Sequence, residues 1–75
     1  MKELVEIIAR ALVDDKNAVT VTERTEGDDV VLTLSVADAD MGKVIGKQGR
    51  IAKAIRTVVK AAAIRADKRV TMEIE

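Results

Sequence analysis

The sequence contains no cysteine, no histidine, no proline and no aromatic residue among its 75 residues. Without cysteine the chain can form neither disulfides nor thiolate metal sites, and without histidine it lacks the commonest general base and metal ligand. Without aromatic rings, a nucleic-acid site cannot depend on base stacking. Only carboxylates and amines remain for acid–base chemistry, and their spacing suggests no site. We therefore predict that the chain is not an enzyme and has no catalytic residues, no metal site and no cofactor.

Long apolar runs are also missing. No stretch approaches the roughly 18 apolar residues that span a membrane, and no charged-then-apolar leader begins the chain, so we expect a cytoplasmic protein without a membrane partner. Apolar residues make up 48% of the chain and charged residues 35%, which is typical of a folded domain rather than of disorder. The length predicts one domain over residues 1–75. Such a domain buries only about 60% of its unfolded surface and would gain stability from a partner chain.

The net charge of zero conceals an asymmetry along the chain. Residues 1–42 include ten acidic and four basic residues, whereas residues 43–69 include nine basic residues and one acidic residue. The basic segment indicates a polyanionic partner such as a nucleic acid. A solvated helix rich in lysine explains the charge alone equally well, so charge does not decide between them.

Apolar periodicity predicts six elements in the order α-β-β-α-α-β. The predicted helices cover residues 2–14, 41–45 and 50–66, and the predicted strands cover residues 19–22, 30–36 and 69–75. The turn at residues 26–29 is short enough to join the first two strands as an antiparallel hairpin. Asp38 and Asp40 are candidate caps for the short second helix.

The connection between the second and third strands passes through two helices, so these strands should pair in parallel with a right-handed crossover. Each strand has one apolar face, which predicts that the helices cover one side of the sheet. The predicted fold class is therefore two-layer α+β, with a three-stranded mixed sheet and three helices on one face. The opposite face is expected to meet water through Thr20, Thr22, Thr33, Ser35, Thr71 and Glu73.

A glycine loop, Gly-Lys-Gln-Gly at residues 46–49, separates the last two predicted helices in the most basic stretch of the chain. Glycine permits backbone angles and close approach that a β-carbon would block. A loop that opens a helix also offers free N–H groups to an anion. Lys47, Arg50 and Lys53 add positive charge, so the loop is a candidate clamp for a phosphate backbone.

Other glycine-rich phosphate loops do not fit this segment. A Walker A loop would need glycine at position 41 and serine or threonine at position 48, where the chain has Met41 and Gln48. The dinucleotide fingerprint would need glycine at position 44, which is Val44. The remaining alternative is a corner between helices in which glycine only allows the bend. The location of the loop in the basic segment favours the phosphate clamp.

The run from Val44 to Ile51, VIGKQGRI, resembles the signature of KH domains, whose G-x-x-G loop clamps about four nucleotides of single strand. The element order is similar to the bacterial, type II KH fold. The length and residues 52–62 are similar to small bacterial single-KH proteins of the KhpA type. The resemblance implies binding of single-stranded RNA as an RNA chaperone or post-transcriptional regulator, homodimer formation, and heterodimer formation with a larger KH-domain protein.

By motif position, the resemblance also assigns RNA-binding roles to seven residues. The backbone clamp consists of Gly46, Lys47, Gln48 and Gly49, with Ile45 lining the groove and Arg50 and Lys53 beside the phosphates. The strand side of the groove stays open, because no motif marks which of Val31, Thr33 or Ser35 faces the bases.

The predicted helix over 50–66 has three faces at about 100° per residue. The core face gathers Ile51, Ile55, Val58, Val59, Ala62 and Ala66, and a basic face gathers Lys53, Arg56 and Lys60. A third face follows Arg50 at coiled-coil spacing through Ala54, Thr57, Ala61 and Ile64. Small residues at this spacing let two helices approach closely, which predicts a homodimer interface. Alternatively, alanine simply favours helix, and Ile64 is one exposed apolar residue.

Two functions therefore stay open. The first is a binding module for single-stranded RNA that contacts mainly phosphates. The alternative is a protein-interaction module that dimerises with a larger KH-containing partner, with RNA binding secondary. The sequence does not separate RNA from single-stranded DNA, because no residue can be assigned to a 2′-hydroxyl.

Overall fold

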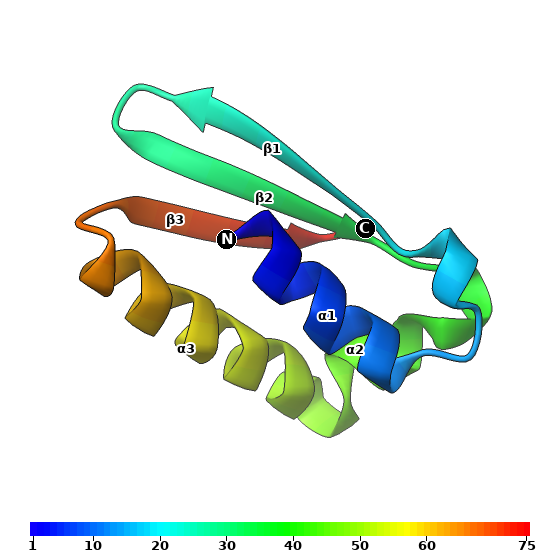
Figure 1. Ribbon diagram of the computed structural model, residues 1–75. Helices are drawn as coiled ribbons and strands as arrows, with labels where there is room; N and C mark the ends of the chain where they lie inside the picture. The colour runs from blue at the N-terminus through cyan, green and yellow to red at the C-terminus, as the bar shows by residue number, and fades with distance from the viewer.

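The computed structural model describes residues 1–75 and has the predicted order of elements (Figure 1). Its helices are α1 (Lys2–Leu12), α2 (Met41–Ile45) and α3 (Arg50–Arg65), and its strands are β1 (Thr20–Glu26), β2 (Asp29–Ser35) and β3 (Arg69–Ile74). Short 3-10 turns lie at Lys16–Ala18, Asp38–Asp40 and Lys47–Gly49. The first strand is longer than predicted, since β1 pairs with β2 as far as Glu26.

The sheet has the order β1-β2-β3, with β2 in the centre. β1 and β2 form the predicted antiparallel hairpin, in which Thr22 lies opposite Thr33. β2 and β3 pair in parallel, with Leu32 beside Met72, which confirms the crossover through the two later helices. β1 and β3 are consequently the two edge strands.

All three helices lie on one face of the sheet, which confirms the two-layer arrangement (Figure 1). The periodic apolar residues of α1 and α3 meet those of the central strand to form the core. Its members include Val5 and Ala9 of α1, Leu32 and Leu34 of β2, Val44 of α2, and Ile55 and Val59 of α3. None of the helices combines the length and apolar character needed to cross a membrane.

The uncovered face of the sheet is less exposed than the sequence predicted. Thr33 was expected to meet water, but it is only 7% exposed, and its neighbour Val31 is only 5% exposed. Both lie on the central strand. An ion pair from Arg24 on β1 to Glu73 on β3, 3.6 Å long, connects the two edge strands across them. The expectation was wrong for Thr33 because neighbouring side chains, rather than a helix, exclude water from it.

The core face of α3 is also rotated from the predicted one. The buried residues are Ala52, Ile55, Val59 and Ala63. Val58, assigned to the core by the helical pattern, is 45% exposed, and Ala66 is exposed beyond the end of the helix. The small side chains of Ala52 and Ala63 allow a close approach of the helix to the sheet. Because these two alanines are buried instead of Val58 and Ala66, the buried face of α3 is turned toward β3.

Candidate nucleic-acid interface

The glycine loop connects α2 to α3 and has a backbone that only a few residue types adopt. Gly46 has φ 75° and ψ 174°, and Gly49 has φ 74° and ψ 15°. A β-carbon on Gly46 would lie 2.6 Å from Cγ1 of Ile51. Gly46 therefore has to be glycine, and its absent side chain lets the loop pack directly on the first turn of α3.

The start of α3 is electrostatically open to an anion. No side chain caps the helix, and its first turn has no acidic residue. The positive end of the helix dipole therefore faces the glycine loop without a carboxylate to neutralise it. This is the property that a phosphate-binding loop requires.

The three cations predicted around the loop are exposed and form no ion pair. Lys47 and Lys53 have no hydrogen-bonded side-chain partner, and Arg50 reaches only Oε1 of Gln48, at 3.4 Å. Ile45, at the end of α2, is 36% exposed and lies next to Gly46 in the chain. The structure thus presents an apolar side chain and unpaired cations on the two sides of the loop.

β3 is a candidate for the strand side of the groove. A hollow between α3 and β3 is lined by Arg56, Val59, Lys60, Val70, Thr71 and Met72. Nε of Arg56 donates a hydrogen bond to the carbonyl oxygen of Met72, 3.2 Å away, at the free edge of the sheet. The candidates Val31, Thr33 and Ser35 lie on the central strand and do not line this hollow, and their place in the groove stays a prediction.

The same groove continues toward the turn between α3 and β3. Lys60, Val70 and Thr71 are shared with a second hollow, which also contains Ala63, Ile64, Lys68, Arg69 and Asp29. Asp29 is the one acidic residue in the two hollows, and Arg69 pairs with it at 3.7 Å. The basic residues Arg56, Lys60, Lys68 and Arg69 therefore form a basic track along these two hollows, from the middle of α3 to the turn.

This geometry agrees with the comparison of the chain with known families. Residues 2–74 match the model of the KH domain of KhpA and KhpB. The chain belongs to the KhpA/KhpB family of KH domains. The predicted type II KH fold, with its α-β-β-α-α-β order, is thereby confirmed.

Several curated relatives of this KH domain have nearly the same length. The RNA-binding protein KhpA of Clostridium perfringens is 64% identical over 74 residues, which cover 99% of each chain. RNA-binding proteins KhpA of Clostridium acetobutylicum and Aquifex aeolicus are 61% and 50% identical over 74 residues, which cover 99% of this chain and 99% and 94% of the relatives. No solved structure matches the chain.

The four residues predicted to form a dimer interface are all exposed in the KH domain. Ala54 lines an apolar groove between α1 and α3, together with Ile8, Leu12, Arg50, Ile51, Ile55 and Val58. Ile64, 78% exposed, instead lines the hollow beside β3. Val58 is the exposed apolar side chain that the sequence missed, because its spacing from Ile55 and Val59 placed it in the core.

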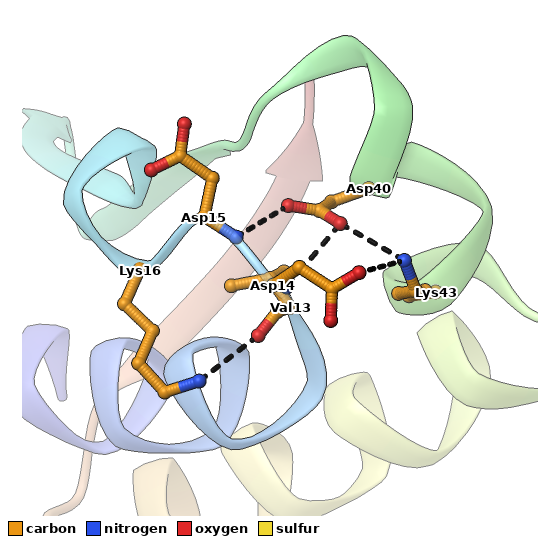
Figure 2. A network of polar contacts seen from close by, with 6 residues as sticks. All are labelled: Val13, Asp14, Asp15, Lys16, Asp40 and Lys43. Atoms are coloured by element: carbon orange, nitrogen blue, oxygen red, sulfur yellow. Dashed lines mark hydrogen bonds and ion pairs between the residues drawn. The ribbon is translucent and has the colours of Figure 1, made fainter.

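A polar network joins the start of α2 to the end of α1 in this KH domain (Figure 2). The carboxylate of Asp40 accepts the N–H groups of Asp15 and Asp14, at 3.0 and 3.3 Å, and Nζ of Lys43 at 3.1 Å. Lys43 also pairs with Asp14 at 2.8 Å. The prediction that Asp38 and Asp40 cap α2 was wrong, because neither side chain accepts a backbone N–H group of that helix.

The network also fixes the charges of its members. The N–H group of Asp15, aided by Lys43 and the N–H group of Asp14, lowers the pKa of Asp40 against the opposing effect of burial. Hydrogen bonds to Asp14 and Asp40 raise the pKa of Lys43. Lys43 is therefore charged but already paired, which separates it from the unpaired cations of the glycine loop.

Proposed function

We propose that the chain binds single-stranded RNA, with its phosphates on the glycine loop and its bases along the groove between α3 and β3. The observation that carries the proposal is the uncapped start of α3 beside the unpaired cations Lys47, Arg50 and Lys53. The curated relatives, which align over nearly the whole chain, are named RNA-binding proteins.

The loop and the groove contact different parts of the RNA. Gly46 and Gly49 let the phosphate backbone approach the N–H groups of the loop, while Lys47 and its neighbours neutralise its charge. Ile45 offers an apolar surface to a base at the entrance, and Val70 and Met72 line the groove beyond it. Without aromatic stacking, phosphate contacts dominate the affinity.

The first experiment measures fluorescence anisotropy on a short single-stranded RNA at several salt concentrations. For roughly three to four phosphate contacts, the logarithm of the association constant should fall with the logarithm of salt concentration at a slope of about −2 to −3. The double variant Lys47→Asp/Gln48→Asp should lose binding while circular dichroism shows that it is folded. Equal binding by this variant and the wild type would exclude the clamp.

A matched control separates the loop from the overall charge. Lys16→Asp/Asn17→Asp makes the same change of charge, with a lysine and a side-chain amide replaced by aspartates, at an exposed turn outside the groove. It should weaken RNA binding only slightly, through long-range repulsion that added salt screens. A loss as large as that of the loop variant would mean that net charge, not the loop, governs binding.

We further propose that the chain acts as a dimer in an RNA chaperone or regulatory role, because an apolar groove stays open between α1 and α3. Ala54 lines this groove, and Thr57 and Ala61 lie on the exposed side of the same helix. The same observation favours the second candidate function, heterodimer formation with a larger KH-domain protein through this surface. RNA binding would then be secondary.

Two single substitutions locate the dimer interface. Val58→Asp places a charge on the α1–α3 groove, and Ile64→Asp places one in the hollow beside β3. Light scattering should show a monomer for Val58→Asp if the groove is the interface, and for Ile64→Asp if the predicted stripe extends to the end of α3. A wild type that is monomeric at all concentrations would exclude the homodimer and leave the heterodimer to be tested with the larger partner.

A further inference from the structure

Asp40 is the only buried charged residue of the chain, and the glycine loop does not use it directly. Its side chain is 3% exposed, and both carboxylate oxygens are occupied. Oδ2 accepts the N–H group of Asp15, while Oδ1 accepts the N–H group of Asp14 and the ammonium of Lys43 (Figure 2). A buried carboxylate with three donors holds the segments that supply those donors firmly together.

The segment that Asp40 holds leads directly to the glycine loop. α2 begins at Met41, immediately after Asp40, and Gly46 follows its last residue. A helix of five residues has too few internal hydrogen bonds to define its own position. Its place must come from the contacts at its ends and on its buried face. They include Asp40 at one end, Met41, which packs against the core, and Val44, fully buried, near the other end.

We propose that Asp40 is a positioning residue for RNA binding: by fixing the start of α2 to the end of α1, it sets the direction in which α2 presents the glycine loop. This inference rests on the proposed function. Without the carboxylate, α2 keeps the apolar contacts of Met41 and Val44 and the exposed ion pair of Lys43 with Asp14. It loses the buried hydrogen bonds that fix its start, so the loop can shift at the end of a helix about 7.5 Å long.

The chemistry of the contact requires a carboxylate. An asparagine at position 40 would keep one acceptor oxygen and turn its NH₂ group toward a backbone N–H or toward Lys43, which are themselves donors. At least one of the three hydrogen bonds would be lost, and the NH₂ group of the asparagine would face another donor in a buried site. Asp40→Asn therefore releases α2 without changing any residue of the loop.

The proposed role of Asp40 and the loss of its charge predict opposite changes in the RNA affinity of Asp40→Asn. Removing a carboxylate near a site for a polyanion should strengthen binding through the long-range field. If Asp40 positions the loop, Asp40→Asn should instead weaken binding, by roughly five- to tenfold. Asp38→Asn is the matched control, since Asp38 lies in the same turn, is exposed and has no side-chain hydrogen bond or ion pair.

The first measurement compares RNA affinities by anisotropy, at a temperature where circular dichroism shows every variant to be folded. Asp38→Asn should bind as tightly as the wild type or slightly more tightly, whereas Asp40→Asn should bind more weakly with an unchanged salt slope. Val21→Ala, which truncates a buried residue of β1 and leaves Asp40 and its hydrogen-bond partners unchanged, lowers stability and should keep its affinity. Equal affinities of Asp40→Asn and Asp38→Asn would overturn the proposal.

Hydrogen–deuterium exchange gives a second readout that does not depend on RNA. Amides of residues 46–50 should exchange faster in Asp40→Asn than in the wild type, in Asp38→Asn or in Val21→Ala. Unchanged exchange in this segment would overturn the positioning role. If the wild type fails to bind RNA, the proposed function fails, while the exchange experiment still decides whether Asp40 holds the loop.

Discussion

Three glycines of one short segment have different conformations. Gly42 lies in α2 with an ordinary helical backbone and open space around it, whereas Gly46 and Gly49 both have positive φ. Only Gly46 is also pressed against a neighbour, the side chain of Ile51. The sequence predicted the need for glycine in the loop. It could not rank the two loop glycines, because the clash depends on where α3 starts.

Alanine substitutions at these positions should therefore differ in sign as well as in size. Gly46→Ala should destabilise the fold by about 2–4 kcal/mol, through an unfavourable backbone and a clash with Ile51. Gly49→Ala should cost about 1 kcal/mol for the left-handed backbone alone. Gly42→Ala should raise the free energy of unfolding by about 0.5–1 kcal/mol, since alanine favours helix. Urea unfolding followed by circular dichroism measures all three, and equal effects of Gly46→Ala and Gly49→Ala would contradict the packing of Gly46 on Ile51.

Asp40 gives the protein a defined response to acid. The network lowers its folded-state pKa below the unfolded value of about 3.9. Its contribution to stability is therefore complete above the unfolded pKa and is lost as the pH falls through the folded pKa. The unfolding midpoint of the wild type in urea should exceed that of Asp40→Asn at pH 7, and the difference should shrink below about pH 4. A constant difference at all pH values would contradict the assigned ionisation.

At the scale of elements, α3 shows what periodicity can and cannot predict. The extent of the helix and its basic face were predicted from spacing alone. The direction of its core face was not, because Ala54, Ala61, Ala62 and Ala63 are equally apolar in the sequence. Which alanines are buried depends on the close approach to the sheet. For the same reason, the sequence could not identify β3 as the strand beside the basic face.

The two sides of α3 should respond differently to the loss of one positive charge. Lys60 lines both hollows of the basic track, whereas Arg65, at the end of the same helix, is exposed and lines neither. Lys60→Gln should weaken RNA binding and reduce the magnitude of the salt slope by about 1, as expected for a lost phosphate contact. Arg65→Gln should leave the slope unchanged. A reduced slope in Arg65→Gln and not in Lys60→Gln would place the RNA on the other side of α3.

For the whole molecule, the element order and the strand pairing could be predicted, because a hairpin and a right-handed crossover leave few other arrangements. The Asp40 network could not, since it joins residues 25 and 26 positions apart whose meeting depends on the finished fold. The glycine loop and its neighbouring cations could thus be predicted from the sequence. The contacts that hold the loop in place could be identified only from the tertiary structure.

The small core makes the molecule sensitive to a single cavity. Leu32 is fully buried in the central strand, and Leu32→Ala should cost about 2–5 kcal/mol, a large part of the total stability expected for a domain of this size. Thermal unfolding should show a strongly lowered midpoint that rises again when RNA is added, because RNA binds only the folded state. A midpoint within a few degrees of the wild type would mean that the core collapses around the cavity.

The two edges of the sheet also differ in how they can join another molecule. On β3, Arg56 already bonds the carbonyl of Met72, and α3 flanks the strand. β1 has no such bond, so a strand from another chain would add more readily to β1 than to β3. Addition at β1 would join two sheets edge to edge through their β1 strands. The occupied Met72 carbonyl on β3 then hinders further growth toward the open-ended stacking of strands in amyloid fibres.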